Sequence, residues 1–278
     1  MQPLGACLSL PPILDNKHQD MPSVFEPAAL LREARRQKGL SVSDVPPVCI
    51  LDPDGDIVRD LKKSGAAKRN ADWPCYHTDL YAFPLAGQIA GIIPCAVGAP
   101  FAVLVAEELF ACGCQTLISM TSAGQIVPAA EPPYFVVIDR ALRDDGTSYH
   151  YAAPDTLAEA DPQLIATAQR ALQSAGLPSY VGPSWTTDAP FRETAEAIAS
   201  ACAKGVLAVE MEAAALYTFA RRRNKIVLCL AQVTNRMGLA DQDFEKGQVQ
   251  GAADALTILE TVTAALRSKE VGFDRGLR

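Results

Sequence analysis

The chain has 278 residues, of which 49% are hydrophobic and 21% are charged, and its formal net charge is −7. This apolar content excludes an intrinsically disordered chain, and 18 glycines and 20 prolines without a repeat exclude a collagen-like one. The acidic balance argues against nucleic acid as a partner, because a broad nucleic-acid interface needs a basic face.

Apolar runs with helical and strand character alternate along the chain. Helices are expected over 30–38, 57–64, 101–112, 162–175, 190–203, 212–223 and 251–266. Strands are expected over 48–51, 81–83, 89–95, 116–120, 134–139 and 226–232. This alternation predicts an α/β fold with one central sheet covered by helices.

The chain contains no internal repeat and no linker long enough to separate two domains. We therefore predict an N-terminal extension with a helix over 1–45 and a single domain over 46–278. The segment 80–106 has no charged residue and is long enough to cross a membrane. Because Pro84, Pro94 and Pro100 would break a spanning helix, buried strands are expected there and no membrane partner.

The eight cysteines lie mostly in apolar runs, such as Cys49 and Cys229. This placement predicts buried free thiols and a cytoplasmic protein, since disulfides are rare in that compartment. The three histidines lack the spacing of metal ligands, so no metal is predicted.

Small and charged residues follow two of the predicted strands, where ligands of open α/β sheets bind. After the first strand, Gly55 permits a tight turn and Arg59, one helical turn later, can return its guanidinium group to an oxyanion. Thr121 to Gly124 form a predicted loop of small residues after the strand 116–120. The alternative for Gly55 and Arg59 is an ordinary turn followed by a surface arginine. The alternative for Thr121 to Gly124 is a strand end that is merely closely packed. No phosphate-binding glycine motif of the nucleotide-triphosphate or dinucleotide type occurs.

The segment from Val206 to Leu216 carries two carboxylates, Glu210 and Glu212, inside an apolar run. A buried carboxylate needs partners or a raised pKa. A helix that begins near Glu212 would stabilise that side chain through its N-terminal dipole. The two carboxylate oxygens also suit the adjacent hydroxyl groups of a ribose; a merely capping glutamate is the alternative.

Two further polar segments complete the candidate site. Thr186 to Thr194 is predicted as a turn into a helix, with Asp188 at or near its N-cap. Arg143 to Tyr151 is predicted as a polar loop, in which His150 lies between two tyrosines.

Together these segments resemble the nucleoside phosphorylase family, which includes uridine phosphorylase, hexameric purine nucleoside phosphorylase and the methylthioadenosine nucleosidases. Gly55–Arg59 resembles the family's Gly-Asp-Pro-x-Arg pattern, Thr121–Gly124 its glycine-rich strand exit, and Glu210–Ala215 its Met-Glu ribose motif. The matches follow the family's order from about Val48 to Leu266. The resemblance implies a three-layer α/β/α fold with a distorted mixed sheet, in a dimer or hexamer whose active site lies near a subunit interface.

The resemblance also implies that inorganic phosphate cleaves the N-glycosidic bond of a nucleoside to a free base and ribose 1-phosphate, without a further cofactor. Glu212 and Arg59 would be the catalytic residues, and Glu210, Met211 and Glu212 would hold the ribose. The residues implied for phosphate are Gly55, Arg59, Thr121 and Ser122, with Arg143 and His77 as compensating groups. The residues implied for the base are Ala123, Gly124, Thr187, Asp188, Phe191, Arg192, Asn235 and Arg236.

The chain also departs from the family pattern. Ser119 stands where uridine phosphorylases carry a phosphate-binding arginine, and no arginine adjoins His77, where a second one would cross the subunit interface. Asn235 and Arg236 replace the catalytic aspartate of the purine branch, which slightly favours a pyrimidine nucleoside such as uridine. A nucleosidase that uses water and a non-catalytic nucleoside-binding protein are the alternatives.

Overall fold

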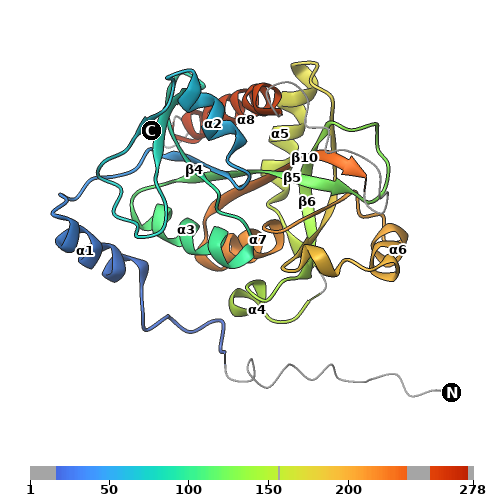
Figure 1. Ribbon diagram of the computed structural model, residues 1–278, viewed down its shortest axis with the longest axis horizontal. Helices are drawn as coiled ribbons and strands as arrows, with labels where there is room; N and C mark the ends of the chain where they lie inside the picture. The colour runs from blue at the N-terminus through green and yellow to red at the C-terminus, as the bar shows by residue number, and fades with distance from the viewer. Residues whose placement is uncertain (1–16, 156, 237–250, 275–278) are drawn as a thin grey trace.

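A ten-stranded mixed sheet runs through the centre of the computed structural model, which describes residues 17–155, 157–236 and 251–274 (Figure 1). The strands are β1 (Val48–Asp52), β2 (Lys68–Arg69), β3 (Tyr81–Leu85), β4 (Gln88–Pro94), β5 (Thr116–Gln125), β6 (Tyr134–Asp144), β7 (Leu157–Glu159), β8 (Ser179–Thr187), β9 (Ala208–Glu210) and β10 (Ile226–Arg236). Their order is β10-β6-β8-β9-β5-β1-β4-β3-β2, with β7 paired to β6. The α/β class with a distorted mixed sheet is therefore confirmed.

Five of these strands close into a ring. β5 pairs with β9 on one edge and with β10 on the other, and β10, β6, β8 and β9 complete the circuit. The register of β10 against β5 shifts between Val233 and Asn235, and that of β6 against β8 shifts between Ile138 and Ala141. Such irregularities bend and twist a strand, which allows the sheet to curl.

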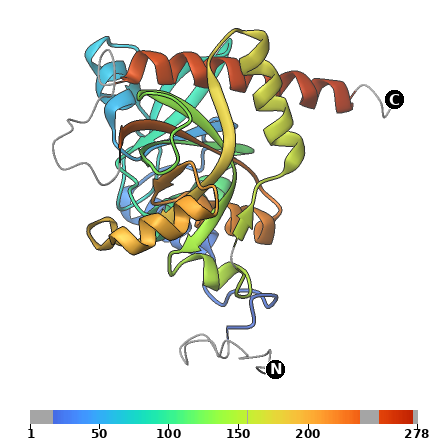
Figure 2. The same cartoon turned by 90° about the vertical axis from the view of Figure 1, so that its right-hand side faces the viewer.

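Helices cover both sides of this sheet. They are α1 (Pro27–Lys38), α2 (Asp56–Lys63), α3 (Ala99–Ala111), α4 (Ser148–Tyr151), α5 (Pro162–Ser174), the 3-10 helix η2 (Pro190–Arg192), α6 (Ala195–Ala203), α7 (Ala213–Arg223) and α8 (Ala252–Asp274). α2, α5 and α8 lie along one face, and α1, α3, α4 and α7 lie along the other (Figures 1 and 2). This arrangement gives the three layers that the sequence predicts.

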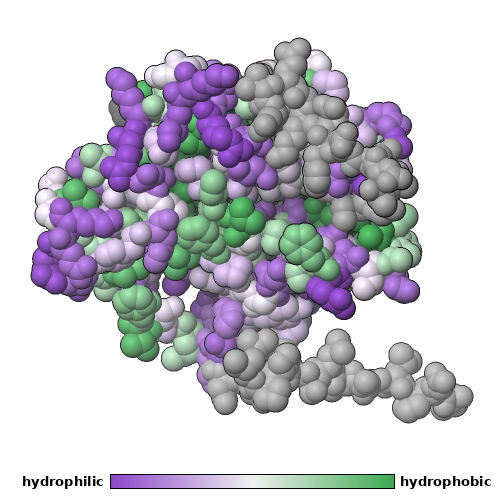
Figure 3. Space-filling view, in the orientation of Figure 1, coloured by the Kyte–Doolittle hydropathy of each residue, from purple (hydrophilic) through white to green (hydrophobic). Residues whose placement is uncertain are grey.

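The helix α7 is buried along its first two turns, from Ala213 to Ala220. Three consecutive alanines at its start let the backbone lie close to the sheet, and a helix buried on all sides reads as apolar throughout. The helix α1, in contrast, is buried on one side only. It packs near α3 with Leu31 and Ala34 buried, and its charged side chains face outward (Figure 3).

Three predicted strands, β5, β6 and β10, continue well beyond their expected ends. Thr121 to Gly124 are not a loop, because β5 continues to Gln125 with hydrogen-bonded partners on both edges. The last strand likewise continues from Gln232 to Arg236. β6 continues to Asp144, so Arg143 lies in the strand and does not open a loop, and Ser148 to Tyr151 form a short helix.

The helix predicted over 190–203 is wrong in its first part. Pro190 to Arg192 form a 3-10 turn, and the α-helix begins at Ala195. Its N-cap is Thr194, whose Oγ1 accepts a hydrogen bond from the Ala197 N–H at 3.2 Å, so Asp188 is not the cap. The strands β8 and β9 were not predicted, because their residues lack a sustained alternation of polar and apolar side chains.

Seven cysteines lie among the described residues, and all seven are free thiols. Five are buried, as predicted, whereas Cys95 and Cys202 are exposed. Among the described helices, none has the length and apolar character needed to cross a membrane.

Candidate active site

The candidate site lies where β1 ends beside the middle of β5. These strands are parallel, with Leu51 beside Ser119, so the residues that follow Asp52 lie next to Thr121 and Ser122. A small cavity at this edge is lined by side chains from both strands, from α2 and α8, and from β10; its polar members are Asp52, Asp54, Asp56, Thr121, Ser122 and Gln232.

Glu210 is buried at the end of β9 and receives four hydrogen bonds. Its Oε1 accepts from Ser184 Oγ at 2.9 Å and from Thr186 Oγ1 at 2.5 Å, and its Oε2 accepts from the N–H groups of Glu212 and Ala213, each at 2.7 Å. Four donors stabilise the ionised carboxylate, although burial raises the pKa of Glu210. Glu210 therefore holds the start of α7, and its contact with ribose stays a prediction.

Glu212, two residues later, has a different environment. Only 2% of this residue is exposed, and its Oε1 accepts a hydrogen bond from the Gly98 N–H at 2.8 Å. Its Oε2 is buried without a hydrogen-bond partner among the described residues. A buried polar atom left in this state costs about 1–3 kcal/mol, so it is the natural contact for a ligand hydroxyl group.

Burial, and then the adjacent charge of Glu210, raise the pKa of Glu212 to about 8. The hydrogen bond from the Gly98 N–H and the nearby Thr121 side chain oppose this rise in pKa, and the charge of Asp54 adds to it. Glu212 is therefore mostly protonated near neutral pH. A protonated carboxyl group can donate one hydrogen bond and accept another, which suits a pair of hydroxyl groups.

Ser122, predicted to bind phosphate, is held by Asp54. Asp54 Oδ2 accepts hydrogen bonds from the Ser122 N–H at 2.9 Å and from Ser122 Oγ at 2.5 Å. Thr121 lies alongside, with its Oγ1 3.3 Å from the carbonyl oxygen of Ser122. The two donors of Ser122 thus converge on one carboxylate oxygen.

Gly55, also predicted to bind phosphate, begins α2 in the left-handed region with φ 73°. Its N–H donates to the carbonyl oxygen and to Oδ1 of Asp52, at 3.0 and 3.1 Å, and Asp52 Oδ2 accepts from the Val58 N–H at 2.9 Å. Burial is the main reason why the pKa of Asp52 rises to about 7, and the charges of Asp54 and Asp56 contribute. An aspartate of the chain therefore occupies the N-terminus of α2.

Arg59 extends from α2 with 62% of its side chain exposed and forms an ion pair with Asp56. Two like unit charges about 4 Å apart repel by about 4 kcal/mol at an effective dielectric constant of about 20. A phosphate group at this edge would lie near the carboxyl groups of Asp52, Asp54 and Asp56. Arg59 is the cation that matches the family's Gly-Asp-Pro-x-Arg pattern.

Arg143 does not reach this edge. It is 7% exposed, and its guanidinium group donates to Ser148 Oγ and to the carbonyl oxygens of Ala152 and Ala153 at 2.7–3.1 Å. The guanidinium carbon also lies 4.4 Å from the ring centre of Tyr149. Arg143 orders the turn after β6, and its phosphate role stays a prediction.

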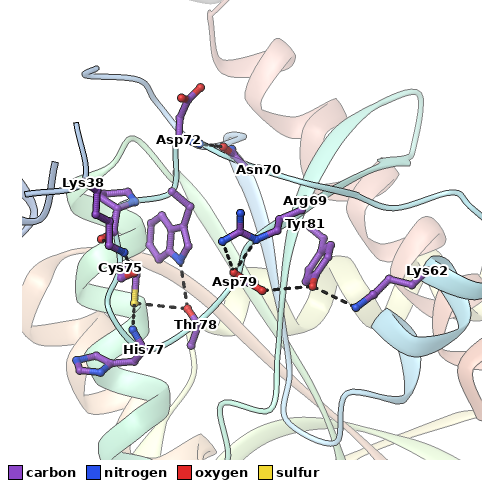
Figure 4. A network of polar contacts seen from close by, with 12 residues as sticks. Lys38, Lys62, Arg69, Asn70, Asp72, Cys75, His77, Thr78, Asp79 and Tyr81 are labelled. Carbon is purple, nitrogen blue, oxygen red and sulfur yellow. Dashed lines mark hydrogen bonds and ion pairs between the residues drawn. The ribbon is translucent and has the colours of Figure 1, made fainter. Parts of the chain in front are cut away.

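His77 lies in the loop before β3, and its N–H donates to Cys75 Sγ at 3.3 Å (Figure 4). Its ring lies 6.5 Å from that of Phe101, centre to centre. The nearby cation Arg69 pairs with Asp79 at 2.8 Å. His77 thus contacts its own loop and α3, and its phosphate role stays a prediction.

The residues predicted for the base come from the ends of β5, β8 and β10. Ala123 and Gly124 lie in β5, opposite Val233 and Asn235 of β10. Thr187 follows Thr186, which pairs with Glu210, so the end of β8 adjoins the ribose motif. The structure therefore gathers the ends of these three strands around the carboxylates.

Other predicted base residues have partners of their own. Asp188 Oδ2 accepts from the Gly146 N–H at 2.7 Å, and Arg236 forms an ion pair with Glu131. Phe191 is 98% exposed and Arg192 is also exposed on the turn η2. Base recognition by these side chains remains a prediction.

Four further residues of the candidate site were not predicted: Asp52, Asp54, Gly98 and Ser184. Thr186 was predicted only as the start of a turn, without its contact to Glu210. The acidic run around Gly55 is visible in the sequence, but nothing local indicates that it faces Ser122. Gly98 lies 114 residues from Glu212 along the chain, so only the fold reveals that contact.

These features define an α/β protein with buried carboxylates at the exits of its central strands, which form a candidate small-molecule site. The family model described as the phosphorylase superfamily matches residues 47–265. The chain belongs to this superfamily, as its sequence motifs predict.

Relatives within the superfamily have several substrate names. The chain is 29% identical over 181 residues to the uridine phosphorylase of Thermococcus kodakarensis, covering 59% of this chain and 64% of that one. It is 29% identical over 127 residues to the guanosine phosphorylase of Halorubrum lacusprofundi, covering 46% of this chain and 53% of that one. The chain thus spans between about half and two thirds of the length of these curated relatives.

The solved structure of uridine phosphorylase from Vibrio fischeri ES114 aligns with 81% of this chain and 95% of its own, with a TM-score of 0.68 and 21% identity. The same enzyme complexed with 6-hydroxy-1-naphthoic acid gives a TM-score of 0.64 at 22% identity. At these identities the likeness establishes the fold.

Proposed function

We propose that this protein cleaves the N-glycosidic bond of a nucleoside. The observation that carries the proposal is Glu212, a buried carboxyl group whose Oε2 has no hydrogen-bond partner among the described residues. Ribose offers the adjacent hydroxyl groups that such a carboxyl group binds. The superfamily assignment and the names of the relatives support the same ligand class.

In this proposal the chain contributes position and charge. Glu212 and Met211 hold the sugar, and Glu210 fixes the start of α7, which carries Glu212. Fixing the sugar relative to the attacking group lowers the entropic barrier to the reaction. The carboxylate of Glu210 also favours the positive charge that develops on the sugar as the base leaves.

Inorganic phosphate is the attacking group that the names of the relatives support, with ribose 1-phosphate as the sugar product. Those names include uridine, guanosine and purine nucleoside phosphorylases, so they support different bases. Asn235 and Arg236 at the end of β10 favour a pyrimidine nucleoside, since neither can act as an acid toward a purine ring near neutral pH. Assembly into a dimer or hexamer and a cytoplasmic location stay predictions.

A panel of purified nucleosides tests the proposal. The full chain is incubated with uridine, thymidine, inosine, guanosine and adenosine, and release of free base is followed by chromatography. Base release from at least one nucleoside is the expected result. Binding of nucleosides without release of base would favour the non-catalytic alternative.

A further inference from the structure

The end of α7 carries a basic run in a chain whose formal net charge is −7. The run comprises Arg221, Arg222, Arg223 and Lys225. Arg223 forms an ion pair with Glu107 at 2.9 Å, whereas Arg221 and Lys225 are exposed and form no ion pair within the described part of the chain. Cations in the last turn stabilise the helix dipole, which explains a basic residue here. The dipole alone does not explain why two of these cations line one groove.

The way in which α7 ends brings these two cations to the same groove. Asn224 adopts the left-handed conformation with φ 52°, and the Lys225 N–H donates to the carbonyl oxygen of Ala220 at 2.8 Å. A left-handed residue of this kind ends a helix and turns the chain back over its last turn. Lys225 therefore follows Arg221 along the groove, with its Nζ 5.3 Å from the ring centre of Phe110.

The groove has a volume of about 950 Å³ and is also lined by two carboxylates. Glu159 ends β7, and Asp161 is the N-cap of α5, where its Oδ1 accepts from the Gln163 N–H at 2.7 Å. No ion pair within the described residues joins these carboxylates to Arg221 or Lys225. Opposite charges that line one groove without meeting leave room for a ligand that contacts both.

Apolar side chains complete the lining of the groove. They belong to Leu164, Ala220, Ile226 and Val227, together with the buried Tyr217. Small-molecule sites commonly have volumes of about 300–1,000 Å³ and combine an apolar lining with a few charged groups. The groove therefore has the size and the composition of a ligand site.

We infer that this groove binds a phosphorylated sugar, with the phosphate group at Arg221 and Lys225 and the sugar hydroxyl groups at Glu159 and Asp161. A guanidinium group offers two parallel N–H donors to phosphate oxygens, and an ammonium group adds a second positive charge. Carboxylates accept hydrogen bonds from hydroxyl groups. Inorganic phosphate would leave the carboxylates without a partner, and a neutral sugar would leave the cations without one. A free sugar phosphate and a nucleotide share this chemistry.

This site is separate from the candidate active site and does not depend on the proposed function. Glu212 precedes the first residue of α7, whereas Arg221 and Lys225 lie at its far end. The 11 residues of α7 span about 16 Å. A ligand in the groove therefore leaves Glu212 free.

Calorimetric titration of the full chain at physiological ionic strength tests the inference. The probes are ribose 5-phosphate, uridine 5′-monophosphate, ribose and inorganic phosphate. The two phosphorylated sugars should bind at least about 10-fold more tightly than ribose or phosphate, because only they engage both pairs of charges. Tighter binding of uridine 5′-monophosphate than of ribose 5-phosphate would identify a nucleotide as the ligand, and the reverse order would identify a free sugar phosphate.

Variants place the binding in the groove. Arg221→Ala should weaken binding of ribose 5-phosphate by about 10-fold or more, as loss of a charge-assisted hydrogen bond does. Arg222→Ala is the matched control, because it removes the same charge from the same helix end but does not line the groove. It should change binding by less than about twofold, since exposed charges are screened by salt. Arg221→Lys, which keeps the charge at the helix end, should bind more tightly than Arg221→Ala, and urea unfolding checks that each variant is folded.

Three results would overturn the inference. The first is the absence of binding of either phosphorylated sugar to the wild-type protein. The second is an equal loss for Arg221→Ala and Arg222→Ala, which would show a diffuse attraction of charges. The third is loss of binding in Glu212→Ala, which would place the ligand in the candidate active site. Binding that Glu212→Ala retains and Arg221→Ala loses supports the groove even if no nucleoside releases base.

Discussion

Glu210 and Glu212 are two residues apart, yet their carboxyl groups have opposite environments. Glu210 accepts four hydrogen bonds from the chain, whereas Glu212 accepts one from Gly98 and keeps Oε2 without a partner among the described residues. One glutamate therefore stabilises the fold around the site, and the other is available to a ligand. Four predictions follow from this pair and from the core beneath it.

Glu212→Ala should reduce base release by about 100-fold or more, because it removes the group that fixes the sugar. The rate is measured with the best nucleoside of the panel. Glu196→Ala, which truncates an exposed glutamate of α6, is the control and should retain normal activity. Near-normal turnover by Glu212→Ala would refute the assignment of the ribose site.

The stability of the protein should depend on pH through Glu212. The pKa of this group is about 8 in the folded chain, above its ordinary value of 4.5. A raised pKa means that the unfolded chain releases the proton more easily, so its contribution to stability is complete below pH 4.5 and is lost as the pH rises to about 8. The glutamine of Glu212→Gln does not ionise in this range, so this variant should not lose stability for this reason as the pH rises.

Urea unfolding near pH 4.5 and near pH 8 measures the effect. The free energy of unfolding of Glu212→Gln should increase relative to the wild type as the pH is raised. The exposed control Glu196→Gln should follow the wild type at both values. Parallel curves for Glu212→Gln and the wild type would show that Glu212 ionises normally.

Thr186→Val should destabilise the fold by about 1–3 kcal/mol, because it removes a buried donor to a charged group. Thr186 Oγ1 donates to Glu210 and accepts from the Ala214 N–H at 2.9 Å, so valine leaves both groups without this partner. Thr257→Val on the exposed face of α8 is the matched control. Equal urea midpoints for the two variants would contradict the role given to Thr186.

Tyr217→Phe should also lower the free energy of unfolding by about 1–3 kcal/mol. The buried Tyr217 hydroxyl group donates to the carbonyl oxygen of Ile138 at 2.5 Å and accepts from the Cys229 N–H at 3.0 Å, which joins α7 to β6 and β10. Tyr76→Phe removes an exposed hydroxyl group and should have little effect. The comparison uses thermal or urea unfolding of both variants.

Much of the fold follows from local patterns. Apolar runs at Val48, Thr116 and Ile226 begin strands where the sequence predicts them, because burial on both faces of a sheet demands continuous apolar residues. The predicted ends of β5 and β10 lie several residues before the ends that the structure shows. Small polar residues there read as loop, although pairing on both edges of β5 keeps them in the sheet.

The sequence by itself determined the α/β class, the helix α7 and the burial of Glu210 and Glu212, since a charge inside an apolar run is visible locally. Only the tertiary structure decided which partner each carboxylate has. Asp54 lies 68 residues from Ser122, Thr186 lies 24 from Glu210, and Gly98 lies 114 from Glu212. The physical reason is that hydrogen bonds depend on distance and direction in space, and these are settled only when the strands pair.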